Sequence, residues 1–444
     1  MKPVSKFLAA VALLAVPMTV SAPAWAADEK PKKEKKGKKE EAPAALKLTL
    51  SKEFRAVYDP VVNTYLKSKD AVAASASWEA LKAATKTPDE QYQLGIFGAQ
   101  IGREAKNDSM YSQAVDLVLA STTTPADQRT AYTFQKAATA YDTKNWSTAE
   151  EWLIKAYEMG YKSATIAGGV EMLIADAMNA QKKFPESLEW MQKSYDASLL
   201  PGAKALPESF FPRAANVALK TKNRDLIAKW MRELVRNNPT SDYWHDALMQ
   251  TYAVGQLDTQ EELDLMRLLR SVGAMKYEQN YSAYATDALI AFFPTEMKSV
   301  LDEGFAKGTI SKNNATFGGR YADVLEKLKL EPFSATVLDQ DIANAKTGAA
   351  SAFAGDIALS VGEYARAKGA YEAAIAKGSI VDKEGKDLME RTIMRLGIVK
   401  LKMGDIAGAK AEFAKATNGG RKAVADYWLL YADQIEKGIA PTAS

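Results

Sequence analysis

Few residues of this 444-residue chain fall in patterns that support catalysis or metal binding. The chain has no cysteine, which excludes disulfides, thiol catalysis and thiolate–metal sites. Its single histidine, His245, cannot form a zinc motif that needs two histidines on one helix. His245 could act as a general base, but no motif surrounds it, and we interpret it as a surface or helix-packing residue.

Other candidate motifs lack the partners that their chemistry requires. Asp339 and Asp341 have neither the glycine nor the distal glutamate of a calcium loop. No phosphate-binding G-x-x-x-x-G-K-[ST] loop, G-x-S-x-G elbow or S-x-x-K pair is present. The many carboxylates are spread along the chain and are interpreted as solvated helix faces. The sequence therefore predicts no catalytic, metal or cofactor-binding residue, no cofactor and no enzyme activity.

The charge distribution argues against a nucleic-acid partner. The formal net charge is +3, but it comes from the N-terminus. Lys2 and Lys6 are the only charges in residues 1–26, and residues 27–45 hold seven lysines and five acids. The chain from Leu46 onward is nearly neutral. A nucleic-acid-binding domain normally carries a clustered basic face, which we do not find in this composition.

The N-terminus has the three parts of a secretory signal peptide. Lys2 and Lys6 precede an apolar run from Phe7 to Val16, which Pro17 ends, and Ala24-Trp25-Ala26 offers small residues at a cleavage site. The run is too short to span a bilayer, which takes about 20 residues, although a permanent anchor is the alternative. We expect residues 1–26 to be removed after Ala26 and the mature chain to be periplasmic, without a transmembrane segment and without a lipid-modified cysteine.

Residues 27–46 form a Lys/Glu-rich segment of low complexity. The stretch from Asp28 to Ala45 has no aromatic and no large aliphatic side chain, so it cannot bury enough surface to offset its ordering entropy. We predict a disordered linker that acts as a solvated spacer. The alternative role is a weak contact between its lysines and an anionic envelope polymer.

Helical periodicity dominates the rest of the chain. Apolar residues recur at spacings of three and four, as in Ala149, Leu153 and Ala156, whereas alternating strand patterns are hard to find. Proline and glycine separate segments of helical length. The sequence predicts an all-α fold.

An internal repeat supports this prediction and indicates that the helices are arranged in similar pairs along the chain. Six positions of one segment recur 42 residues later with identical spacing. A third copy shares the internal spacing, and looser copies begin at Ala175 and Ala215. The three clear copies comprise Gly355, Gly362, Tyr364, Ala367, Tyr371 and Ala374, then Gly397, Gly404, Ile406, Ala409, Phe413 and Ala416, and earlier in the chain Ala137, Trp146, Ala149, Leu153 and Ala156.

The repeat spacing suits a pair of closely packed helices. A small residue on each helix lets the axes approach, as Gly355 and Ala367 would do. A bulky residue four positions later, such as Tyr371, would fill the groove toward the next hairpin. The turn between the helices needs a residue that adopts the left-handed conformation easily, which explains Gly362 and Gly404.

This pattern resembles the tetratricopeptide (TPR) repeat. The resemblance implies an α-solenoid with TPR-like hairpins over residues 47–275 and further hairpins over 276–440, the clear pair at about 347–420. A last helix from Ala423 to Glu436 is expected to cap the array. The offsets of 38 and 42 exceed the usual 34 residues, so another α-solenoid or a non-repetitive bundle are the alternatives.

TPR arrays usually act as assembly or adaptor modules, so the resemblance implies a scaffold that binds protein or peptide partners in the cell envelope. Two alternatives stay open. Aromatic clusters such as Phe210-Phe211 and Tyr243-Trp244 could line a groove for polysaccharide or peptidoglycan, although aromatics at helical spacing are more often core. The array could also be a passive structural spacer.

Overall fold

The computed structural model describes residues 46–163 and 165–441. Over these ranges the chain forms twenty-two α-helices and no strand beyond one isolated bridge between Val381 and Asp387. The all-α prediction is confirmed. The predicted signal peptide, and the linker up to Ala45, lie outside the described residues. Among the described helices, none combines the length and apolar character needed to cross a membrane.

The chain divides into two compact units, the first ending at Glu208 and the second beginning at Ser209. Each unit is built mainly of helical hairpins, in which most consecutive helices pack on one another. The boundary that the sequence placed between residues 275 and 276 falls between two helices inside the second unit.

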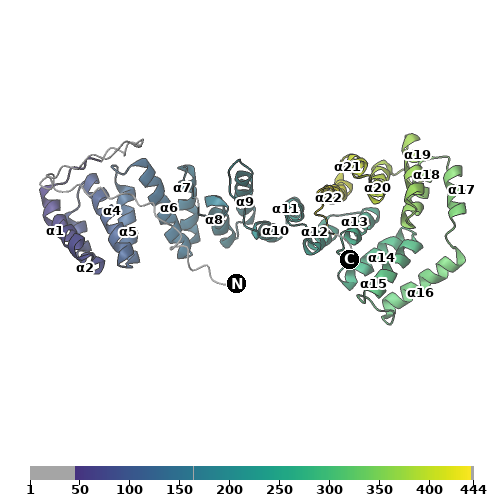
Figure 1. Cartoon of the computed structure of the whole chain (residues 1–444), viewed down its shortest axis with the longest axis horizontal. Coiled ribbons are helices and arrows are strands. Elements are labelled where there is room, and N and C mark those ends of the chain that lie inside the picture. The colour runs from purple at the N-terminus through teal and green to yellow at the C-terminus, as the bar shows by residue number, and fades with distance from the viewer. Residues whose placement is uncertain (1–45, 164, 442–444) are drawn as a thin grey trace, which may run out of the picture. The chain divides into compact units, whose positions relative to one another are not determined.

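The first unit stacks its helices in chain order (Figure 1). Its hairpins are α4 with α5, α6 with α7 and α8 with α9, and each contacts the next hairpin through adjacent helices. At the N-terminal end, α1 pairs with two short helices, α2 and α3. The helices are α1 (Lys52–Ser68), α2 (Ala71–Ser75), α3 (Trp78–Ala84), α4 (Pro88–Glu104), α5 (Asp108–Ala120), α6 (Ala126–Asp142), α7 (Trp146–Glu158), α8 (Gly169–Ala180) and α9 (Phe184–Ser198).

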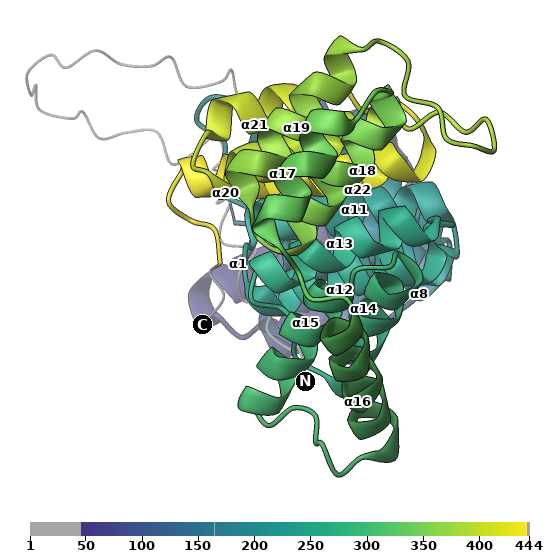
Figure 2. The ribbon, with the colours of Figure 1, turned by 90° about the vertical axis from the view of Figure 1, so that its right-hand side faces the viewer.

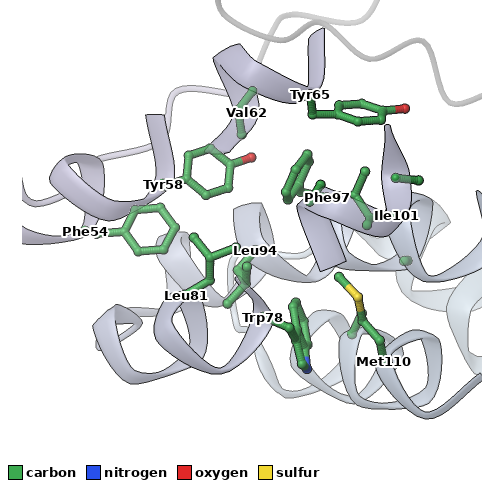
Figure 3. Close-up of a cluster of buried hydrophobic side chains, with 14 residues drawn as sticks. Phe54, Tyr58, Val62, Tyr65, Trp78, Leu81, Leu94, Phe97, Ile101 and Met110 are labelled. Atoms are coloured by element: carbon green, nitrogen blue, oxygen red, sulfur yellow. The ribbon is translucent and has the colours of Figure 1, made fainter. Parts of the chain in front are cut away.

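An apolar and aromatic cluster holds the N-terminal end of the first unit together (Figure 3). Tyr58 and Tyr65, one helical face of α1, both meet the ring of Phe97 edge-on at centroid distances of 5.5 and 5.8 Å. A Cβ on Gly98 would lie 2.4 Å from the Trp78 ring, so only glycine admits this indole against α4. The core of these hairpins therefore depends on shape and apolar burial.

The second unit contains α10 to α22, and its last helix packs against helices far away in the sequence. Helix α22 contacts α20 and α21 as well as α11 and α13, which both figures of the ribbon show (Figures 1 and 2). The helices are α10 (Phe210–Thr221), α11 (Arg224–Asn237), α12 (Ser241–Val254), α13 (Thr259–Ser271), α14 (Glu278–Ile290), α15 (Pro294–Ala306), α16 (Ala315–Leu330), α17 (Ala335–Asn344), α18 (Gly348–Ser360), α19 (Tyr364–Ala376), α20 (Met389–Lys402), α21 (Ile406–Phe413) and α22 (Gly419–Glu436).

Most hairpin turns share one backbone conformation. In nine turns of the described chain, a residue in the left-handed conformation follows the first helix. After six of these, at positions 106, 144, 182, 292, 362 and 404, the next N–H donates to a carbonyl five residues back, as in a Schellman motif. The left-handed residues are Lys69, Lys106, Lys144, Lys182, Lys222, Gln256, Phe292, Gly362 and Gly404.

Candidate functional site

The repeat positions of the first unit lie inside one hairpin. Ala137 on α6 and Ala149, Leu153 and Ala156 on α7 are fully buried. Trp146 is partly buried at the start of α7, where its ring meets Tyr141 edge-on at 5.2 Å. These residues bring two helices together and face no cavity that we identify, so their role is structural.

The two C-terminal copies use their glycines for close helix contact. A Cβ on Gly355 would lie 2.6 Å from the ring of Tyr371, and a Cβ on Gly397 would lie 2.7 Å from the ring of Phe413. Each bulky ring thus occupies the space that the glycine of the partner helix leaves free.

The remaining repeat positions support the same contacts. Ala367, Ala374, Ala409 and Ala416 are buried on the second helices or just beyond them, and Tyr364 and Ile406 are partly buried at the helix starts. Gly362 and Gly404 form the turns with φ of 80° and 86°. These residues shape the hairpins and do not converge on a site.

A pocket of about 360 Å³ opens between α10, α11 and α12 in the second unit. Its apolar lining combines aliphatic and thioether side chains, and polar side chains of α10 and α12 complete it. Helices α10 and α12 are the first helices of neighbouring hairpins. The lining residues are Pro212, Ala215, Asn216, Leu219, Met231, Leu234, Tyr243, His245, Asp246, Met249 and Gln250.

His245 brings the one unsatisfied polar atom of this pocket. Its side chain is 14% exposed, and its Nδ1 lies 3.3 Å from the Oδ1 of Asp246. Its ring meets Tyr277 edge-on at 4.9 Å. The Nε2 atom is buried and has no hydrogen-bond partner in the described structure. The prediction of a packing residue thus holds for the ring, while Nε2 offers a donor or acceptor to a ligand.

The pocket does not have the composition of a hydrolytic centre. Asp246 is the only carboxylate in the lining, so a pair of acids is missing there. Within the described residues, no group of three or more His, Asp or Glu side chains is placed to hold a metal ion. The arrangement can bind an apolar group and hydrogen-bond its polar neighbours.

A second polar feature, which the sequence did not predict, is a buried ionic network in the second unit. Its centre is Asp264 on α13, which is fully buried. Asp264 accepts hydrogen bonds from Arg267 at 2.7 Å, from Nε of Arg395 at 3.0 Å and from Arg421 at 2.6 Å. These arginines belong to α13, α20 and α22, so one carboxylate ties three helices together.

Two further carboxylates extend the network. Asp356 on α18 pairs with Arg395 at 2.8 Å and accepts a hydrogen bond from the hydroxyl of Tyr371 at 2.8 Å. Glu296 on α15 accepts two hydrogen bonds from Arg267, at 2.8 and 2.6 Å, in the bidentate geometry that suits a guanidinium. The network therefore reaches from α13 to α15, α18, α19, α20 and α22.

The electrostatics of the network are those of a structural core. Burial alone would raise the pKa of Asp264, but the guanidiniums of Arg395, Arg421 and Arg267 outweigh it and lower the pKa to about 2. Burial opposes ionisation of Asp356 as well, yet Arg395 and Arg391 hold its pKa below the usual value. Such carboxylates remain ionised and paired with arginines, so they are poor candidates for a general acid or a general base.

Asp287 on α14 is the contrasting case. It is 2% exposed, and its Oδ2 has no hydrogen-bond partner among the described residues. Burial, with the nearby charge of Glu262, raises the pKa of Asp287 to about 7 against a small lowering effect of Tyr252. This carboxyl titrates near neutral pH without contacting the pocket.

The interpretation of the carboxylates as solvated helix faces is wrong for Asp264, Glu296 and Asp356. All three are buried, because each finds at least one arginine on another helix. The available signal was Arg395, which lies in the run from Met394 to Leu401 where nearly every other residue is apolar. A charge at a core-facing position of such a helix requires a buried partner.

Comparisons with known proteins add little beyond the fold. No protein-family model matches the sequence, and no curated protein matches it. Among solved structures, the Naa15/Naa10 complex bound to HypK-THB shares 14% identity, covering 88% of this chain and 56% of that chain, with a TM-score of 0.31. The TPR domain of P58(IPK) shares 11% identity over 87% of this chain and 98% of its own, with a TM-score of 0.20. Yeast Tom70 shares 11% identity over 87% of this chain and 96% of its own, with a TM-score of 0.21.

Proposed function

We propose that this protein is a non-catalytic scaffold whose second unit binds an extended segment of a partner protein. The observation that carries this proposal is the pocket on α10 to α12, which joins an apolar lining to polar side chains at its mouth. First helices of neighbouring hairpins form a groove in TPR-like arrays, and a peptide laid along it reads successive hairpins.

The chemistry of the lining suits one anchoring side chain of a peptide. Met231, Leu234 and Met249 provide an apolar surface that adapts to shape, since the thioether side chains are flexible. The amides of Asn216 and Gln250 can each donate to and accept from a peptide backbone. Asp246, whose side chain is 64% exposed, favours a cationic residue beside the anchor.

The test is binding of a peptide array to the protein, followed by affinity measurements on the best peptide. The double substitution Asn216→Arg, Gln250→Arg places long side chains at the pocket mouth without changing the core. We expect it to weaken binding at least tenfold, or about 1.4 kcal/mol. The matched control is Asn313→Arg, an exposed residue before α16. Equal affinity of the double variant and the control would contradict the proposal.

A glycan ligand is the second candidate, favoured by Tyr243 in the lining and the unsatisfied Nε2 of His245. An aromatic ring beside a hydrogen-bonding group is a common way to hold a sugar face. His245→Ala should then abolish binding or turnover on a panel of envelope glycans. If the variant keeps the full wild-type response, this candidate loses its main residue.

Export to the periplasm is also a proposal, supported by the three-part pattern of residues 1–26. A fusion of residues 1–45 to alkaline phosphatase, which is active only outside the cytoplasm, tests it. Replacing Leu13 and Leu14 by Arg should abolish phosphatase activity by interrupting the apolar run. If the fusion with the unchanged residues 1–45 has no phosphatase activity, export is refuted.

A further inference from the structure

Four lysines occupy equivalent turn positions in the first unit. Lys69, Lys106, Lys144 and Lys182, called here the turn lysines, each follow the first helix of a hairpin with φ between 52° and 64°. They are separated by 37 or 38 residues, one hairpin repeat. A further lysine with positive φ, Lys222, follows the first helix of a hairpin in the second unit and is not one of the turn lysines.

The backbone does not require lysine at these turns. Gly362 and Gly404 hold the same place in the second unit, and the hydrogen bond that follows them matches the one after Lys106, Lys144 and Lys182. A non-glycine residue in the left-handed region costs about 1–2 kcal/mol, and a cation at a helix C-terminus recovers only about 0.3–1 kcal/mol. Four successive lysines therefore indicate a use for the side chain.

The turn lysines are exposed to solvent and form no ion pair in the described structure. Lys69 only rests over the Tyr65 ring at 5.5 Å. The carboxylate next to Lys69, Asp70, accepts a hydrogen bond from the N–H of Ala73 and so caps α2.

The charge around the four turns is positive on balance. Within three residues of the turn lysines, the sequence has seven cations and four carboxylates. Glu104, one of the four, accepts hydrogen bonds from Tyr65 and Gln100. The side chains directly next to the turn lysines are polar, except for Ala105. Exposed large apolar side chains lie near Lys69 alone of the four, where Leu66 is 43% and Val72 is 68% exposed.

Hairpin geometry places the turn lysines on one edge of the first unit. Each turn joins the end of a first helix to the start of a second helix, and the hairpins α4–α5, α6–α7 and α8–α9 stack in order. Packed helices lie about 8–10 Å apart, which puts successive turn lysines at intervals of roughly 10–20 Å. The result is a line of ammonium groups.

We propose that the turn lysines form a docking edge for a linear polymer of phosphate groups. A line of separated point charges matches a flexible polyanion, which can place a phosphate near each ammonium without a fixed register. Binding gains free energy from released counterions and is therefore salt-dependent. A bilayer would need apolar anchors along the edge, and exposed large apolar side chains, Leu66 and Val72, are found only at the turn of Lys69. The proposal is independent of the pocket in the second unit.

The test measures binding of long-chain inorganic polyphosphate to the full chain at several salt concentrations. The four charge contacts should contribute about −3 to the slope of log K against log salt, taking the single-strand value of about −0.7 per contact. The variant with Lys69, Lys106, Lys144 and Lys182 all changed to Gly should keep its fold, since glycine prefers this conformation. It should bind at least tenfold more weakly with a shallower slope.

Two control variants decide whether position matters. Changing the same four residues to Arg keeps the charge and should keep the affinity within a few-fold. The second control changes four other exposed lysines to Gln: Lys52, the first residue of α1, and Lys86, Lys162 and Lys204, which lie in segments that join hairpins, at the other edge. This variant should bind like the wild type. Every variant retains residues 27–45, so the lysines of that segment contribute equally.

Several outcomes would overturn the proposal. Equal weakening by the Gly and Gln variants would show a non-specific charge effect. Binding of triphosphate as tight as that of the polymer would exclude an extended edge. Tighter binding of polyglutamate, or of phosphatidylserine vesicles, than of polyphosphate would assign the edge to an acidic protein or to a membrane instead.

Discussion

The two units use the same hairpins and join them differently. In the first unit, helices mainly contact their neighbours in the sequence, and the core is mostly apolar and aromatic. Its fully buried glutamate, Glu90, accepts hydrogen bonds from the backbone N–H groups of Ser51, Lys86 and Thr87, and not from an arginine. In the second unit, Asp264 binds arginines 131 and 157 residues away, and α22 contacts α11 and α13. The first unit is therefore close to a one-dimensional array, whereas long-range contacts close the second.

This difference affects how each unit should unfold. In a one-dimensional array, stability is approximately a sum over hairpins and their interfaces, so damage stays local. In the second unit, a shared set of charges connects five helices, so removing one charge leaves others buried with fewer partners. The comparison predicts local unfolding in the first unit and cooperative unfolding in the second.

The substitution Arg395→Met should have the largest effect. It leaves Asp264 and Asp356 buried with fewer counter-charges, and breaking a buried pair in this way costs about 3–5 kcal/mol. Hydrogen exchange should accelerate together in α13, α18, α20 and α22, and not in α4 to α9. Acceleration confined to α20 would contradict the cooperative picture.

A matched control separates charge from shape in that experiment. Arg395→Lys keeps a positive charge beside Asp264 and Asp356, so it should cost less stability than Arg395→Met. In the first unit, Leu153→Ala opens a cavity at a fully buried position and should cost about 2–5 kcal/mol. Its faster exchange should be limited to α6 to α8.

Asp287→Asn should stabilise the second unit at alkaline pH. The pKa of Asp287 is about 7 in the fold and about 3.8 in the unfolded chain, so wild-type stability falls as pH rises through this window. The variant should gain up to about 4 kcal/mol at pH 8 and nothing at pH 4. Denaturant melts at both pH values measure this. Asp264 has the opposite sign, because its lowered pKa means that stability is lost as pH falls from about 4 toward 2.

Gly397→Ala should destabilise by a smaller amount. The new Cβ would lie 2.7 Å from the Phe413 ring, and overpacking of this kind costs about 1–3 kcal/mol. Gly369→Ala is the control, since its Cβ would meet nothing within 4 Å at this exposed position of α19. That change should stabilise by about 0.5–1 kcal/mol. Two thermal midpoints that shift in the same direction would refute the proposed helix contact.

Lys144→Gly should have the smallest effect. Relief of the left-handed conformation is opposed by the added chain entropy of glycine and the lost cation at the helix end, so the net change should stay within about 1 kcal/mol. Gly404→Lys makes the reverse change in the second unit and should destabilise by about 1 kcal/mol. Chemical denaturation of both variants checks whether the two turns are equivalent.

Sequence reasoning recovered what local spacing determines. Gly362 and Gly404 form the turns that the spacing predicts. The rings of Tyr371 and Phe413 pack on the glycines of their own hairpins, although the sequence pattern assigned such rings to the groove toward the next hairpin. The network around Asp264 was missed, because two of its three arginine partners are more than a hundred residues away and no periodic pattern links them. The pocket was also missed, since a cavity depends on how side chains of three helices fail to fill space.

The position of Arg421 bears on the order of synthesis. Asp264 is made 157 residues before this arginine, which supplies its shortest hydrogen bond. While the intervening helices emerge, the Asp264 site lacks one of its three positive partners. The second unit therefore cannot complete its interior step by step behind the ribosome, whereas each hairpin of the first unit can add to the one before it.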